Sequence, residues 1–94
     1  MRKLAWATSF RRAFKRRTHN NPVLEDRIVQ ALDQLTEDPF YPHLKTHKLS
    51  GQLQGLWACW VEYDCRIIFA IEPDPAGGED LFVLIDLGSH DEVY

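Results

Sequence analysis

The sequence contains few of the features that mark metal, redox, secreted or membrane proteins. Its two cysteines, Cys59 and Cys65, have five residues between them and match no zinc-binding or redox spacing. No apolar run approaches the roughly 18 residues that a membrane helix needs, and the apolar stretch 4–7 is too short for a signal peptide. We therefore expect one cytoplasmic domain spanning 1–94, with reduced thiols, no metal, no small-molecule cofactor and no membrane contact.

The sequence also lacks the glycine-rich phosphate loop, the nucleophile elbow and the dinucleotide fingerprint that identify several large enzyme classes. Positive charge is nearly missing from the second half of the chain, residues 49–94, which contains nine of the fourteen acidic residues but only one arginine, Arg66, and no lysine. The net charge of −3 therefore hides a basic first half. A basic cluster in that half favours a polyanion or an acidic protein as partner, with a solvated helix face as the alternative; it comprises Arg11, Arg12, Lys15, Arg16 and Arg17.

The first half of the chain predicts a strand followed by two helices. Residues 3–8 alternate weakly between apolar and polar side chains, which is typical of a strand. Thr8 or Ser9 is expected to cap a helix that ends near 19–21. Asn21 and Pro22 form a helix start, and an apolar stripe with helical spacing follows until Pro39 stops it. That stripe consists of Leu24, Ile28, Ala31, Leu32 and Leu35.

The second half predicts strands. A connector at 40–55 precedes two β-rich runs, 57–62 and 66–71, which form a hairpin with its turn at 63–65. Trp57 and Trp60 lie three apart, so they point to opposite faces of the first of these strands. The run 81–87 has apolar side chains at both odd and even positions, so both faces of the strand are expected to be buried. It therefore predicts an internal strand, which Gly88 ends. The fold class is α+β, in the order β-α-α-β-β-β, with an antiparallel sheet and a helical hairpin on one face.

Three motifs then carry a resemblance to a known family. They are His47-Lys48-Leu49-Ser50-Gly51, the hairpin sequence from Gly55 to Phe69, and Leu87-Gly88-Ser89-His90-Asp91-Glu92-Val93-Tyr94. Together with the paired helices, they make the chain resemble the RelE/ParE toxin superfamily, and within it the YafQ-type messenger-RNA interferases. The resemblance covers essentially the whole chain. It implies a RelE-like fold, cleavage of mRNA in the ribosomal A site, and neutralisation by a cognate antitoxin.

The same resemblance assigns roles to particular residues. It implies catalytic roles for His47, Asp64, His90 and Tyr94, and it places Arg66 where many members have an arginine at the start of the third strand. One departure is that YafQ-type members have a histidine where this chain has Trp60. A second is that many RelE-type toxins are strongly basic, whereas this chain is net acidic.

The chemistry of metal-free RNA cleavage agrees with these assignments. The reaction needs a base for the 2′-hydroxyl proton, an acid for the departing 5′-oxygen, and positive charge near the phosphate. Imidazole titrates near neutral pH, so His47 and His90 are the candidate proton carriers. Lys45, Lys48 and Arg66 are the candidate substrate-binding cations, although a pairing of Arg66 within the hairpin is equally compatible with the sequence.

Two other functions stay open from the sequence. One is a ParE-like inhibitor of DNA gyrase, which shares the fold but does not need both histidines. The other is a non-catalytic homologue that retains antitoxin binding only. In each case we expect the antitoxin to contact the basic residues Arg11, Arg12, Lys15 and Arg16.

Overall fold

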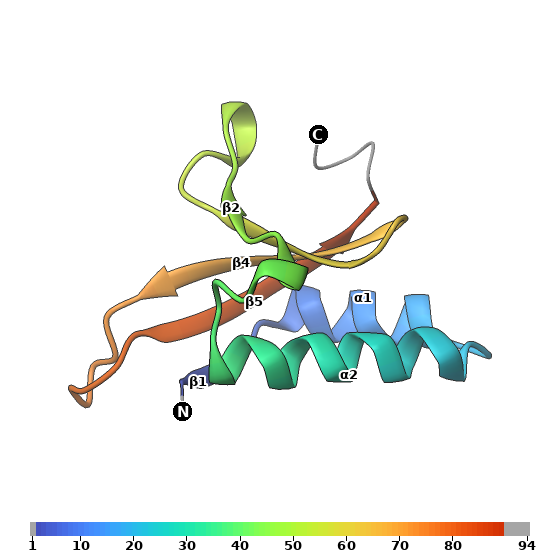
Figure 1. Cartoon of the computed structure of the whole chain (residues 1–94), viewed down its shortest axis with the longest axis horizontal. Helices are drawn as coiled ribbons and strands as arrows, with labels where there is room; N and C mark the ends of the chain where they lie inside the picture. Colours follow the sequence, from blue (N-terminus) through green and yellow to red (C-terminus); the bar gives the residue numbers. More distant parts are fainter. Residues whose placement is uncertain (1, 90–94) are drawn as a thin grey trace.

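The computed structural model describes residues 2–89, and in this part of the chain two α-helices cover one face of a five-stranded sheet (Figure 1). The strands lie in the order β1-β5-β4-β3-β2. Their bounds are β1 Lys3–Trp6, β2 His47–Lys48, β3 Trp57–Glu62, β4 Cys65–Glu72 and β5 Leu81–Gly88. The helices are α1 Thr8–Thr18 and α2 Pro22–Glu37, and short 3₁₀ turns occupy Pro42–Leu44 (η1) and Gly51–Leu53 (η2). The α+β class and the helical layer are confirmed.

The sheet differs from the expected four-stranded antiparallel arrangement at both of its edges, by a parallel pairing at one and by an additional strand at the other. β1 pairs in parallel with β5, with Lys3 opposite Leu81, so the sheet is mixed. At the other edge the connector contributes β2, in which His47 pairs with Ala58 and Lys48 with Trp57. The parallel pairing joins segments distant in sequence, which local patterns do not determine. β5 is an internal strand, as its apolar run predicted.

The helices begin for different reasons. Asn21 caps α2, because its side-chain oxygen accepts a hydrogen bond from the Leu24 N–H at 3.2 Å, and Pro22 follows at the first helical position. The expected cap of α1 by Thr8 or Ser9 is wrong. Its cap residue is Ala7, without a side-chain hydrogen bond, and the Ser9 hydroxyl instead donates to the Ile85 carbonyl of β5 at 2.5 Å. Ser9 thus ties the helix to the sheet.

The main core lies between the helices and the sheet. Phe10 of α1, Ile28 and Leu35 of α2, and Phe69 and Leu84 of the sheet are all fully buried there. A smaller apolar cluster lies on the opposite face, where Leu49 packs with Ala58 and Ile68. The connector therefore covers part of the face that the helices leave free. None of the helices in the described part of the chain is long and apolar enough to cross a membrane.

Candidate functional site

The register of the strands brings several predicted site residues to the sheet face opposite the helices. His47 pairs with Ala58, and Trp60 lies two residues further along β3 on the same face because strand side chains alternate. Arg66 of β4 pairs with Trp60. Trp57 points the other way and packs against the main core, which confirms that the two tryptophans face opposite sides. We call the residues Lys45, His47, Trp60 and Arg66 the connector-side cluster.

His47 is held in one orientation by the chain next to it. Its Nδ1 lies 2.8 Å from the Lys45 carbonyl oxygen, which can only accept, so Nδ1 donates. The neutral ring therefore carries its lone pair on Nε2, the nitrogen needed for taking a proton. Lys45 adopts a left-handed backbone conformation, with φ of 50°, and this conformation directs its carbonyl toward the ring. The local backbone thus selects the tautomer of His47.

Trp60 brings positively charged and aromatic groups together beside His47. The Lys45 ammonium lies 5.4 Å from the Trp60 ring centroid, over the ring, and the His43 ring meets it edge-on at 5.1 Å. A cation over the face of a tryptophan is an attractive arrangement. Where the resemblance leads one to expect a histidine, this chain therefore has a tryptophan ring with a lysine over it.

Arg66 is engaged by the hairpin that precedes it. Its side chain is buried, and Nη1 donates to the backbone carbonyls of Glu62 and Tyr63, the latter at 2.7 Å. A third contact, to the Cys65 carbonyl, is 3.3 Å long. A guanidinium donating to several turn carbonyls stabilises the turn between β3 and β4. The pairing within the hairpin is therefore present, through backbone oxygens rather than through carboxylates.

Other predicted site residues are not brought to this cluster. Lys48 lies over the Trp57 ring, with Nζ 5.4 Å from its centroid, and so belongs to the helix-side face of the sheet edge. Asp64 is exposed in the hairpin turn, where its backbone carbonyl accepts a hydrogen bond from Arg17 of α1 at 2.7 Å. His90 and Tyr94 lie outside the described residues.

The basic residues of α1 lie on the other side of the sheet from His47. Arg11, Arg12, Lys15 and Arg16 are exposed on this helix, which packs on the face opposite the connector (Figure 1). Arg11 also lies over the Trp6 ring, 5.7 Å from its centroid. The predicted partner surface and the connector-side cluster are thus separate surfaces.

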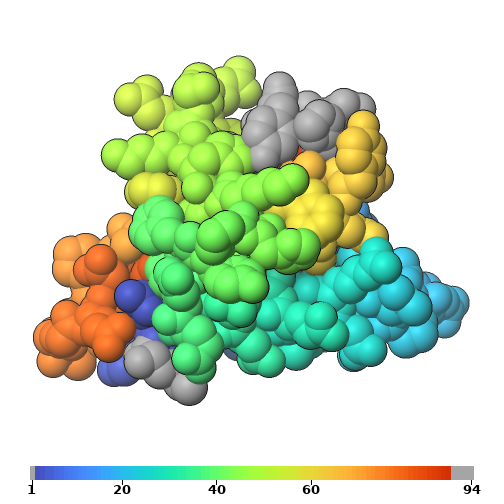
Figure 2. Space-filling view, in the orientation of Figure 1, coloured from blue at the N-terminus to red at the C-terminus, as the bar shows by residue number. Residues whose placement is uncertain are grey.

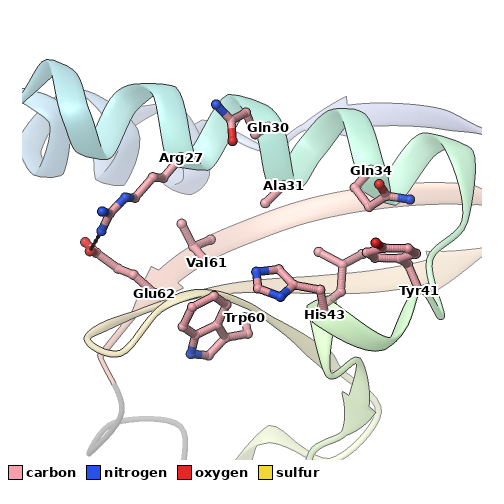
Figure 3. A pocket seen from close by; sticks show the side chains of 10 residues that line it. Arg27, Gln30, Ala31, Gln34, Tyr41, His43, Trp60, Val61 and Glu62 are labelled. Atoms are coloured by element: carbon pink, nitrogen blue, oxygen red, sulfur yellow. Dashed lines mark hydrogen bonds and ion pairs between the residues drawn. The ribbon is translucent and has the colours of Figure 1, made fainter.

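A cavity of about 450 Å³ lies between α2 and β3, next to Trp60 (Figure 3). Figure 3 shows α2 with Gln30 and Gln34 on one side, Tyr41 and His43 at one end, and the Arg27–Glu62 ion pair at the other. We call this the α2–β3 cavity. Sequence reasoning missed it because Gln30 and Gln34 look like ordinary polar residues of a helix surface; their spacing of four is the one available signal.

The cysteines are unsuited to chemistry. Both side chains are fully buried. Burial, with a smaller contribution from the nearby Cys65, raises the pKa of the Cys59 thiol to about 12. Burial likewise raises the pKa of the Cys65 thiol to about 11. Thiols that stay protonated are poor nucleophiles and poor metal ligands. Among residues 2–89, no three His, Cys, Asp or Glu side chains gather in a way that could hold a metal ion.

Solved structures share this fold. The YoeB/ParE toxin from Agrobacterium tumefaciens superposes with a TM-score of 0.75 at 19% identity, covering 94% of this chain and 98% of that one. YafQ from E. coli gives 0.63 at 17% identity, covering 98% and 97%. The YoeB–YefM complex from Staphylococcus aureus gives 0.69 at 14% identity, covering 96% and 98%. The fold is therefore that of small bacterial toxins. No curated protein sequence matches the chain.

The family model described as "Bacterial toxin of type II toxin-antitoxin system, YafQ" matches residues 2–94. The match covers nearly the whole chain, so the chain belongs to the YafQ family of toxins of type II toxin–antitoxin systems. The resemblance found in its motifs is confirmed.

Proposed function

We propose that this toxin is a metal-independent endoribonuclease that cleaves mRNA in the ribosomal A site. The observation that carries the proposal is His47, whose Nδ1–H bond to the Lys45 carbonyl leaves Nε2 as the basic nitrogen. Nε2 is buried in this structure, so bound RNA must first expose it. A neutral imidazole fixed in this way is then suited to take the proton of a ribose 2′-hydroxyl. The 2′-oxygen then attacks the adjacent phosphorus, and the bond to the 5′-oxygen breaks.

The groups around His47 supply the other requirements of this reaction. Lys45 provides positive charge beside the same strand face and can contact a phosphate oxygen. Trp60 offers a surface on which a base can stack. With His47 as the base, we propose His90, the other candidate proton carrier, as the acid that protonates the leaving 5′-oxygen, and Tyr94 and Asp64 as assisting groups. Arg66 acts chiefly on the hairpin turn that forms one border of the site. Lys48 lies on the other face of the same sheet edge, so its proposed contact is with a more distant part of the RNA backbone.

Two measurements test this proposal together: the growth of a bacterial host after expression of the toxin is induced, and primer extension on a reporter mRNA from the same cells. We expect the wild type to arrest growth and to cut within the reading frame, and we expect His47→Gln and His90→Ala to remove the cuts. His19→Gln, a change of an exposed histidine at the end of α1, is the matched control and should cut normally. Arrest without cuts would support a gyrase inhibitor instead, and a folded wild type that does not arrest growth would support a binding module.

We also propose that a cognate antitoxin binds the exposed basic residues of α1. A YoeB–YefM toxin–antitoxin complex from Staphylococcus aureus has been solved with a toxin of this fold. Four exposed cations on one helix attract an acidic segment. Changing Arg11, Arg12, Lys15 and Arg16 to Glu should abolish co-purification with a cognate antitoxin, whereas reversing Lys45 and Lys48 should not. Unchanged binding by the fourfold variant would contradict the assignment.

A further inference from the structure

The α2–β3 cavity adjoins the proposed ribonuclease site through a single side chain. Trp60 lines the cavity and also carries Lys45 over its ring on the connector side. Along β3, Trp60 lies two residues from Ala58, the partner of His47, a spacing of about 7 Å. In Figure 2 the yellow surface of β3 and the green connector lie together, directly beside the teal surface of α2. An RNA strand that runs along β3 from His47 toward Trp60 therefore reaches the lining of the cavity.

The lining of the cavity has the chemistry of a base-binding site. Its volume of about 450 Å³ falls in the range of small-molecule sites. Trp60, His43 and Tyr41 supply flat rings for stacking, as proteins use for unstacked bases of single-stranded RNA. Gln30 and Gln34, four residues apart on α2, each present a donor and an acceptor, the pair of groups that a base edge requires.

The charged groups at the cavity agree with the same ligand. Arg27 and Glu62 form an ion pair of 2.7 Å at one end, and both side chains are partly exposed. An arginine donates to base carbonyl and ring nitrogen atoms, and a carboxylate accepts from exocyclic amino groups. An apolar peptide side chain would use neither of these groups, nor the glutamine amides. Apart from the rings, the apolar part of the lining consists of Ala31, Leu44 and Val61. The lining thus favours a nucleobase over an apolar protein segment.

We propose that the α2–β3 cavity binds one unstacked nucleobase of the RNA whose backbone crosses His47. This inference rests on the proposed ribonuclease function and adds a position at which the toxin reads its substrate. Gln30 and Gln34 are the specificity-determining residues, and Trp60 is the wall that the cavity shares with the connector-side cluster. The toxin therefore prefers particular bases at one position beside its cleavage site.

Nuclear magnetic resonance titration with the four nucleoside 5′-monophosphates tests the cavity without requiring cleavage or ribosomes. We expect at least one nucleotide, at millimolar concentration, to shift the side-chain amide signals of Gln30 and Gln34 and the indole signal of Trp60 along one saturation curve. The double change Gln30→Ala and Gln34→Ala should weaken this binding about tenfold, since two ordinary hydrogen bonds are lost. Alanine favours helix formation, so the variant should stay folded.

Gln52→Ala, in the exposed turn η2 outside the cavity, is the matched control and should bind as the wild type does. The proposal is overturned if no nucleotide shifts these signals, or if the double variant binds as tightly as the wild type. It is also overturned if the antitoxin shifts them and nucleotides do not, because the cavity is then a protein-docking site.

The cut sites on the reporter mRNA separate this inference from the proposed function. Cleavage that keeps its base preference in the double variant would refute the cavity alone. Nucleotide binding by a wild type that never cuts RNA would refute the ribonuclease and retain the cavity as a nucleotide site.

Discussion

Replacing Arg66 by methionine distinguishes a residue that holds the hairpin from one that binds substrate. Methionine keeps much of the length of the arginine stem but removes the donors to the carbonyls of Glu62 and Tyr63. Those carbonyls must then accept hydrogen bonds from water, which can reach the turn on the side where Tyr63 is exposed. We expect Arg66→Met to destabilise the fold through the turn between β3 and β4.

The size of this effect follows from the number and type of bonds lost. Hydrogen bonds from a charged donor contribute roughly 1.5–3 kcal/mol each. Two lost bonds, with hydration of the freed carbonyls taken into account, lower the free energy of unfolding by about 3 kcal/mol. A domain of this size loses about 4–8 °C in Tm for each kcal/mol, so Tm should fall by about 15 °C or more.

Thermal unfolding followed by circular dichroism measures this shift, and Arg27→Met is the matched control. Arg27 also interacts with Glu62, through its carboxylate, but as an exposed ion pair worth at most about 1 kcal/mol. Its Tm should therefore move by only a few degrees. Equal small shifts for both variants would refute the structural role of Arg66. If a folded Arg66→Met protein lost RNA cleavage at a temperature well below its Tm, a direct contact with substrate would be the better account.

Three further predictions concern single groups. His47→Gln should reduce cleavage by about 100-fold or more without changing Tm, as expected for loss of a general base, and an equal loss in His19→Gln would contradict it. Cys59 and Cys65 should resist thiol reagents in the folded protein. Because folding raises their pKa values from 9.0, the stability that their protonated forms contribute is complete below pH 9 and is lost as the pH rises further. Urea titrations above pH 9 should therefore show the free energy of unfolding falling by about 1 kcal/mol per pH unit for each thiol. Cys59→Ala should make this decline smaller. Asn21→Ala should cost about 1 kcal/mol in the same titrations, and no change would refute its role as the cap of α2.

The parts of the fold that were predictable depend on local chemistry. Asn21 and Pro22 begin α2 where expected, and its apolar stripe faces the core, because capping and helical periodicity act within a few residues. The apolar run of β5 likewise indicated an internal strand. The parallel pairing of β1 with β5 was not predictable, because no feature of residues 3–6 specifies a partner near residue 81.

Candidate site residues could be named from the sequence, but their arrangement could not. The connector histidine and lysine were identified, yet the left-handed backbone of Lys45 and its bond to His47 appear only in three dimensions. The sequence was equally compatible with Arg66 binding substrate and with Arg66 pairing within the hairpin. In the structure its side chain is buried and contacts the turn carbonyls. The α2–β3 cavity was missed because it forms where separate elements meet, and none of its residues has a distinctive pattern.

The pairing of β1 with β5 also sets the order of events during synthesis. Lys3 pairs with Leu81, so the strand made first lacks its neighbour until 78 further residues have been added. At about 5–20 residues per second, this takes roughly 4–16 s. Over that interval Phe10 of α1 lacks the buried surface that Leu84 provides in the finished core. A translating ribosome therefore holds an incomplete toxin for seconds, and the folded toxin exists only after the late strand has entered the middle of the sheet.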